Sequence, residues 1–489
     1  MKKILLSTIV ILLTAATGAW AQTSTDIVTK DNFYSYFDAN GNLLDAITSD
    51  KLIFQGEFSN LVNYIYLDRP ITITGDNAVL NNIAIYVSGS DVSLDKISVT
   101  YNAPIEAEAK AIFANDAENF SLTNSEIIFT GANPGGNHYR GLEVRDCDGA
   151  VIDNNTITAT LPVVDVSWSS EGGIDQDLVL AVGIQGGDKV EFTNNIVKVN
   201  IIGEIGWYPT IDAVMVYSAN NILIKGNNIT ILDTTTGDNA RYYYSLDIYS
   251  TTGTVEANDI IVNTTTDIDR TGTAMPIQLT GPFTITVKNN NVTGISKGPV
   301  TAINASNWYG EAILTVENNN IDVTGDVTTS SYYTIVTGIE AQIDTLKAYK
   351  NTINVTNLAG YDDTYPVYGV SMSSPYASGN PSADIQGNNM TVEGKYAVYY
   401  EIVNYTNVIG NALRAHELTG DDAVYIGAGE ENVVKNNVDA FKSITTGVKS
   451  VENSNADVNT YSVTGVRVNT PSHLPKGIYI IGGKKVIVK

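Results

Sequence analysis

The sequence has little positive charge, one cysteine and few strong helix formers. Lys and Arg number 28 against 53 Asp and Glu, and the formal net charge is −25. A surface of this sign repels nucleic-acid phosphates, so no nucleic-acid partner is expected. The single cysteine, Cys147, cannot form a disulfide within the chain, so packing and hydrogen bonds must stabilise the fold. The abundant Asn, Thr, Val, Ile and Tyr favour strands and turns over helices.

Only the N-terminus carries a long apolar run. Lys2 and Lys3 precede apolar residues from Ile4 to Leu13, and Ala19-Trp20-Ala21 ends the segment. The run is too short for a membrane anchor, so residues 1–21 are predicted to be a secretory signal peptide. No later segment could span a bilayer. We therefore expect a secreted or cell-surface protein without a transmembrane anchor.

The remaining sequence repeats at intervals of about 30 residues. Asparagine motifs begin at 194, 227, 258, 290, 319 and 351, and each follows two strand-like segments with period-two alternation. Each unit can bury its apolar face only by stacking on the next. The pattern predicts an all-β, right-handed parallel β-helix of roughly 10–13 coils. A propeller or sandwich is the competing all-β architecture, but the longer blades of a propeller and hairpin signals at matching positions are missing.

The asparagine pairs have a structural interpretation. Asn enters the left-handed backbone region at low cost, and its amide can bond the asparagines of neighbouring coils. Pairs such as Asn227 and Asn228 are therefore expected at a sharp bend between two strands.

The repeat divides the chain into segments. Residues 22–70 are expected to form an N-terminal cap region, residues 71–445 the β-helix, and residues 446–489 a linker with a short C-terminal β segment. The stretch from DNFYSYFDANGNLLD through ITITGDNAVLNNIAIYVSGSDVSLDKISV resembles adhesin-like β-helix surface proteins of gut archaea and bacteria.

The last 30 or so residues break the repeat. The order LPKGIYII followed by GGKKVIVK resembles the C-terminal sorting signal of the type IX secretion machinery of Bacteroidetes. That resemblance implies export through the outer membrane and surface attachment or release. An ordinary hairpin capping the last coil is the alternative.

The first strand of each unit is expected to expose a polar and aromatic strip beside a wall of loops. Candidate binding residues on this side are Gln185, Tyr217, Asp247, Tyr249, Trp168 and Trp207. Exposed rings stack on sugar faces while their polar tips remain hydrated, which suits a glycan. The alternative is that most of these rings pack the loops onto the coils.

Catalytic candidates gather in NHYRGLEVRD, namely His138, Arg140, Glu143 and Arg145. Glycoside hydrolysis needs two nearby carboxylates, but Glu143 and Asp247 are three coils apart, about 14 Å. A polysaccharide lyase needs a base and a cation, which this cluster could supply. The alternative is a solvated ion pair between Glu143 and Arg145.

No metal or cofactor is expected. The histidines His416 and His473 are isolated, so there is no zinc constellation. An acidic loop could hold Ca²⁺ through Asp165, Glu171, Asp175 and Asp177, but it lacks a known calcium-binding spacing and is better explained as solvated.

These observations favour an exported, monomeric, adhesin-like β-helix that binds an extended glycan or another surface polymer along its looped face. A polysaccharide lyase or glycoside hydrolase on the same scaffold is the second hypothesis. A purely structural spacer is the third. The fold alone cannot separate them.

Overall fold

A computed structural model provides the structure of the chain. It describes residues 25–102, 109–133, 139–164, 179–202, 210–233, 242–264, 273–327, 335–373, 381–428, 431–440, 460–462, 477–481 and 484–488. The chain divides into two compact units, Met1–Phe441 and Lys442–Lys489. The predicted signal peptide lies outside the described residues and stays a prediction.

One sheet of the first unit has 13 strands in chain order, and every pairing within it is parallel. Its strands are β3 (Tyr64–Leu67), β5 (Ala84–Val87), β7 (Ala109–Asn115), β10 (Tyr139–Arg145), β13 (Val179–Gln185), β16 (Thr210–Tyr217), β19 (Tyr242–Tyr249), β22 (Thr273–Thr280), β25 (Val300–Ser306), β28 (Val336–Gln342), β31 (Val367–Met372), β34 (Val398–Ile402) and β37 (Val424–Ala428). Each strand therefore pairs with the equivalent strand of the next coil.

The second sheet has 25 strands and contains two parallel ladders that meet at a bend. Before the bend lie β8 (Ser121–Thr123), β11 (Val151–Asp153), β14 (Glu191–Thr193), β17 (Ile222–Lys225), β20 (Thr252–Glu256), β23 (Phe283–Lys288), β26 (Ala312–Glu317), β29 (Thr345–Tyr349), β32 (Ser382–Gln386), β35 (Tyr405–Ile409) and β38 (Asn432–Lys435). After it lie β9 (Glu126–Asn133), β12 (Thr156–Val164), β15 (Ile196–Ile201), β18 (Asn228–Asp233), β21 (Asp259–Thr264), β24 (Asn291–Ser296), β27 (Asn320–Gly325), β30 (Thr352–Asn357), β33 (Asn389–Val392) and β36 (Ala412–Arg414). The long strands β2 (Lys51–Ser59), β4 (Ile71–Asn81) and β6 (Val92–Asn102) belong to the same sheet.

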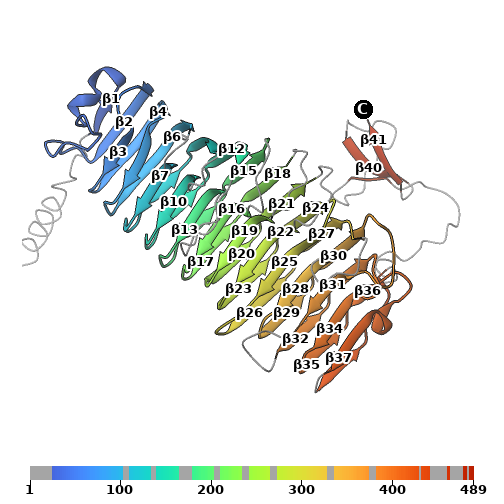
Figure 1. Ribbon diagram of the computed structural model, residues 1–489. Helices are drawn as coiled ribbons and strands as arrows, with labels where there is room; N and C mark the ends of the chain where they lie inside the picture. Colours follow the sequence, from blue (N-terminus) through green and yellow to red (C-terminus); the bar gives the residue numbers. More distant parts are fainter. Residues whose placement is uncertain are drawn as a thin grey trace, which may run out of the picture. The chain divides into compact units, whose positions relative to one another are not determined.

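Three short strands per coil, each parallel to its neighbours, confirm the predicted all-β, right-handed parallel β-helix. Figure 1 shows the strands of the first unit stacked as successive coils. Alternate residues of the strands are buried, as in β18, and the buried side chains form one continuous apolar core. The period-two pattern of the sequence therefore reports the inside and outside of the coil.

Aromatic packing closes the N-terminal end. Strand β1 (Thr25–Val28) pairs in parallel with β2, and the 3₁₀ helix η1 (Lys30–Ser35) follows it. The Phe33 and Phe37 rings stack with centroids 4.8 Å apart, and Phe54 and Phe58 lie 5.0 Å apart beside them. These four rings are fully buried and cover the apolar interior of the first coil.

The second unit contains a small antiparallel sheet. Its strands are β39 (Thr460–Ser462), β40 (Gly477–Ile481) and β41 (Lys484–Val488). The segment that resembles a sorting signal thus forms a hairpin, and sorting itself stays a prediction. The described part of the chain contains no helix with the length and apolar character needed to span a bilayer.

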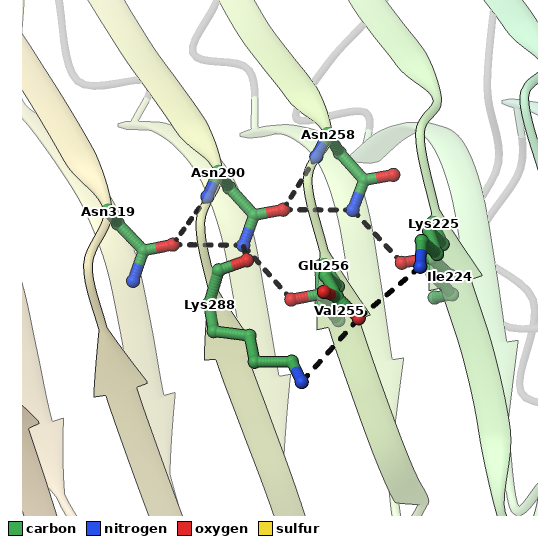
Figure 2. A network of polar contacts seen from close by, with 8 residues as sticks. All are labelled: Ile224, Lys225, Val255, Glu256, Asn258, Lys288, Asn290 and Asn319. Carbon is green, nitrogen blue, oxygen red and sulfur yellow. Dashed lines mark hydrogen bonds and ion pairs between the residues drawn. The ribbon is translucent and has the colours of Figure 1, made fainter.

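A ladder of buried asparagines runs through the bend of the 25-stranded sheet. Its members are Asn155, Asn195, Asn227, Asn258, Asn290, Asn319, Asn351, Asn388, Asn411 and Asn437. At each step the backbone N–H and the side-chain Nδ2 donate to Oδ1 of the next asparagine. For Asn258 and Asn290 these distances are 2.8 and 2.9 Å. The same Nδ2 of Asn258 also donates to the Ile224 carbonyl of the preceding coil, 3.0 Å away (Figure 2).

At each bend, the residue with the left-handed backbone and the residue that joins the ladder are two different, adjacent residues. The residue before the ladder asparagine has positive φ, as at Asn289 (58°) and Asn318 (54°). The sharp bend and the inter-coil bonds therefore belong to neighbouring residues rather than to both members of the pair. In the motif at 194 the left-handed residue is Asn194 (φ 54°), and Asn195 is the ladder member.

Each end of the ladder has a different partner. At the start, Ser125 N–H donates to Asn155 Oδ1 (2.9 Å), and Ser125 Oγ accepts from Ile97 N–H (3.1 Å). At the end, Asn437 N and Nδ2 donate to Asp421 Oδ1 at 3.0 and 2.7 Å. At each step one Nδ2–H of the ladder points toward this end, so the Asp421 carboxyl group accepts at the positive end of the aligned amide dipoles. Asp421 lies in the 3₁₀ helix η3 (Gly420–Ala423).

Replacing an interior ladder residue should destabilise the β-helix. We expect Asn290→Ala to lower the free energy of unfolding by about 3 kcal/mol, because the backbone N–H and Nδ2 of Asn258 lose their shared acceptor and Asn319 Oδ1 loses one of its two donors. The matched control is Asn291→Ala, which removes an exposed bond to Asp259 and should cost below about 1 kcal/mol. Urea unfolding of both variants tests this, and equal destabilisation would contradict the role of the ladder.

Candidate binding face of the 13-stranded sheet

Strand register places outward side chains of the 13-stranded sheet in two columns. Alternation from the buried Leu142 and Val144 sets which residues face outward. The first column contains Arg145, Gln185, Tyr217, Tyr249, Thr280, Ser306 and Gln342. The second contains Glu143, Gly183, Met215, Asp247, Gln278, Asn304, Glu340, Ser371, Tyr399 and Tyr425. We call this surface the outer face; neighbouring coils on it are about 4.8 Å apart.

A cluster of tyrosines lies near the middle of the outer face. The Tyr217 and Tyr249 rings stack with centroids 4.8 Å apart and planes 4° apart. The Tyr249 and Tyr309 hydroxyls are 2.9 Å apart. Tyr309 is 51% exposed and its neighbour Trp308 is 61% exposed. We call Tyr217, Tyr249 and Tyr309 the central tyrosine cluster; it offers aromatic surface and hydroxyls together.

Burial and the neighbouring Tyr309 raise the pKa of Tyr249 well above its ordinary value. The Tyr249 hydroxyl therefore keeps its proton at neutral pH and can both donate and accept a hydrogen bond. The sequence pattern gave no signal for the hydroxyl contact between Tyr249 and Tyr309, because this contact joins residues 60 positions apart. The repeat places residue 309 in the turn after β25.

Polar residues beside the cluster are more buried than expected. Asp247 is 7% exposed and Gln278 is 9% exposed, whereas the sequence predicts an open strip. Gln278 Nε2 donates to Thr280 Oγ1 at 2.7 Å, and Met215 packs against Tyr217 with 2% exposure. Side chains from neighbouring columns and coils thus pack on one another, which leaves mainly the tyrosine rings and hydroxyls accessible. Gln185 is half-buried in the column of Tyr217.

The catalytic candidates form a buried charged cluster toward the N-terminal coils. Glu143 is fully buried. Its Oε2 lies 3.0 Å from Lys110 Nζ and also contacts Arg140 Nη1, and its Oε1 lies 2.8 Å from Arg145 Nη2. Lys110 Nζ lies 4.2 Å from the Phe113 ring centroid.

The ion pair between Glu143 and Arg145 therefore exists. It is not solvated, however, as the alternative to a catalytic role in the sequence analysis assumed. Lys110 joins it because register places this lysine directly beside Arg140 on the preceding coil. A carboxylate that three cations contact is suited to holding them in place. Surface accessibility, which a base acting on a polymer needs, is lacking at Glu143.

Glu340 is a half-buried carboxyl group farther along the same face. Its Oε2 accepts hydrogen bonds from Asn304 Nδ2 at 2.9 Å and from Thr301 Oγ1 at 3.4 Å. Burial raises the pKa of Glu340, and the two hydrogen bonds oppose that effect. Period-two alternation within β28 places Glu340 outward, but no local pattern indicates that its carboxyl group is partly removed from water.

No protein-family model matches the sequence, and no curated protein matches it. Solved structures that resemble the chain include the Streptococcus pneumoniae surface protein and adhesin PfbA, with 12% identity over 76% of this chain and 95% of that chain and a TM-score of 0.41. A DFA-IIIase from Arthrobacter chlorophenolicus A6 has 9% identity over 75% of this chain and 95% of that chain, with a TM-score of 0.38. The A-module of the Azotobacter vinelandii mannuronan C-5 epimerase AlgE6 has 12% identity over 84% and 95%, with a TM-score of 0.26. These identities are too low to indicate a shared function.

Several predicted residues lie outside the described residues. They are His138, Trp168, Trp207 and the acidic residues Asp165, Glu171, Asp175 and Asp177. Within the described ranges, no group of three or more His, Cys, Asp or Glu side chains could hold a metal ion. Cys147 is a buried free thiol whose pKa burial raises to about 11, so it is unsuited to act as a nucleophile.

Removing the shared carboxylate should destabilise the charged cluster. Glu143→Gln takes the counter-charge away from three cations, one of them fully buried, and we expect a loss of about 3–5 kcal/mol in the free energy of unfolding. The control is Glu317→Gln, which breaks the exposed pair with Lys350 and should cost below about 1 kcal/mol. Chemical denaturation of both variants is the measurement. A similarly small loss of unfolding free energy in both variants would show that the charged cluster does not stabilise the fold.

The raised pKa of Glu340 predicts a pH-dependent stability. The folded state binds this proton more tightly than the unfolded state, so the contribution of Glu340 is fully present below its unfolded pKa. It is lost as the pH rises through the folded pKa. Glu340→Gln should therefore match the parent protein at low pH and become relatively more stable toward neutral pH. Melting temperatures of the parent protein and of Glu340→Gln, measured from low to neutral pH, test the prediction. A difference between the two proteins that does not change with pH would contradict it.

Proposed function

We propose that this protein is an exported, adhesin-like surface protein that binds an extended glycan along the outer face. The observation that carries the proposal is the central tyrosine cluster, in which two parallel rings are fixed beside an exposed third ring through a hydroxyl contact. Tyrosines of this kind contact the apolar face of a sugar and bond its hydroxyls at low conformational cost.

The neighbouring polar groups suit an uncharged sugar chain. Gln185, Thr280 and Ser306 are half-buried in the first column and carry an amide or a hydroxyl. These groups both donate and accept hydrogen bonds, as sugar hydroxyls do. The net charge of −25 also opposes the approach of a polyanion.

The lyase hypothesis has weaker support. Glu143 is fully buried and Arg140 is 1% exposed, and both are engaged in the charged cluster. Asp247 lies three coils from Glu143, too far for a carboxylate pair that acts on one glycosidic bond. Binding without turnover is therefore the expected behaviour.

Export and surface exposure belong to the same proposal. Their support is the sequence pattern of residues 1–21 and the resemblance of the C-terminal segment to a sorting signal. This part can be tested separately from glycan binding. The measurement is whether protease added to intact cells of the producing organism digests the protein, compared with the same protein lacking residues 1–21.

Loss of a central tyrosine should weaken glycan binding. We expect the chain to bind at least one soluble neutral polysaccharide among xylan, β-glucan and mannan, and Tyr309→Ala or Tyr249→Ala to weaken that binding by at least about tenfold. Calorimetry with each polysaccharide is the measurement. The matched control is Tyr405→Ala, because Tyr405 is 48% exposed on β35 of the other sheet.

Three outcomes would contradict the proposal. One is the absence of binding to every polysaccharide, including the acidic alginate and polygalacturonate. Another is an equal loss in Tyr405→Ala, which would indicate nonspecific adhesion. The third is the appearance of new reducing ends or unsaturated products, which would favour the enzyme hypothesis.

A further inference from the structure

A second group of tyrosines lies at the C-terminal end of the outer face. The Tyr399 ring stacks between Tyr368 and Tyr425, with centroid distances of 4.5 and 5.0 Å. Tyr396 lies 6.2 Å from Tyr399 and 5.3 Å from Tyr425. We call these four residues the C-terminal tyrosine cluster. They come from β31, β34, β37 and the residues just before β34.

The C-terminal cluster has accessible surface and hydrogen-bonding groups. Tyr425 is 40% exposed, and β37 is the last strand of its sheet among the described residues. The Tyr399 hydroxyl donates to Glu401 Oε1 at 3.3 Å, and Lys395 Nζ lies 5.9 Å from the Tyr396 centroid. Burial raises the pKa of Tyr399, so this hydroxyl stays protonated at neutral pH. The cluster thus repeats the chemistry of the central tyrosine cluster.

The two clusters lie on one face at a separation that the register defines. From β19, which carries Tyr249, to β34, which carries Tyr399, the sheet advances through β22, β25, β28 and β31. At the usual strand spacing these five steps correspond to about 24 Å along the coil axis. Both clusters belong to the first compact unit and to one continuous parallel sheet, so this separation is fixed by backbone hydrogen bonds.

The described strands between the clusters carry polar outward side chains. Half-buried outward positions there hold Asn304, Ser306, Gln342 and Glu340, whereas Gln278 and Ser371 are at most 9% exposed. Strands β22, β25 and β28 contain no lysine or arginine. Amides and hydroxyls can bond the hydroxyls of a sugar chain, whereas the Glu340 carboxyl group disfavours an acidic chain.

We propose that the two tyrosine clusters bind one neutral, linear glycan that lies along the coil axis of the outer face. This proposal rests on the proposed function and adds to it a second binding site and a ligand class. Each cluster holds a segment of the chain, and the amide and hydroxyl columns bond the segment between them. Occupation of one site raises the effective concentration of the same chain at the other, so affinity depends on ligand length.

Length-defined fragments provide the test. Size-fractionated oligosaccharides from the neutral polysaccharide that binds, whether xylan, β-glucan or mannan, would be titrated by calorimetry against the parent protein. We expect weak, length-independent affinity for fragments shorter than about 24 Å and an increase of at least about 100-fold once a fragment spans both clusters. Tyr399→Ala and Tyr249→Ala should each abolish the increase and retain weak binding of short fragments.

Two further variants keep the test decisive. Tyr425→Ala changes an exposed ring at the edge of the sheet and serves where Tyr399→Ala fails to fold; it should reduce the increase at least about tenfold. Tyr405→Ala, on the other sheet, should leave it unchanged.

The failures of the two proposals are distinguishable. If no polysaccharide binds, the proposed function fails. If fragments bind and only Tyr249→Ala weakens them, or if affinity rises smoothly with length in every variant, glycan binding stands and the two-site inference is wrong. A preference for alginate or polygalacturonate over the neutral polysaccharides would also overturn the assignment of a neutral ligand.

Discussion

The buried asparagine ladder is the interaction on which the structure depends. Parallel coils could in principle slide by one residue and still pair their backbones, but a slip would move every inward side chain to the outside. The ladder opposes this, because each Oδ1 accepts two bonds from one particular asparagine of the neighbouring coil. Correct register therefore satisfies buried amides at every bend, and any other register leaves them unpaired. Asp421 can end the series because its side chain accepts both hydrogen bonds and, unlike asparagine, has no N–H group that needs a further acceptor.

Fixed register has a consequence on the opposite sheet. Because equivalent residues of successive coils lie in columns, single tyrosines that are about 30 residues apart in sequence become stacked pairs and clusters. The same geometry brings Lys110 beside Arg140 and turns an apparently simple ion pair into a buried four-residue cluster. The outer face is therefore rigid, and its aromatic rings are held in position before any ligand arrives, which lowers the entropic cost of binding.

Much of the coil could be predicted from local pattern. Period-two alternation identifies the strands of each unit, and the asparagine motif identifies the bend, because both patterns involve residues a few positions apart. The recurrence of these patterns about every 30 residues then indicates that the units stack. Burial on the outer face could not be predicted in this way. Asp247 and Glu143 alternate with apolar neighbours like exposed residues, yet they are buried because of side chains on adjacent coils. Tyr309 likewise contacts Tyr249 across 60 residues, a separation that no local pattern encodes.

Composition and repeat length by themselves determined the fold class and the stacking of coils, since these follow from strand propensity and apolar periodicity. The tertiary structure alone decided which member of each asparagine pair enters the ladder, which outward side chains lose contact with water, and which tyrosines form clusters. The physical reason is that these properties are set by the register between coils. Register is a long-range quantity, and in this protein it is fixed by hydrogen bonds between side chains about 30 residues apart.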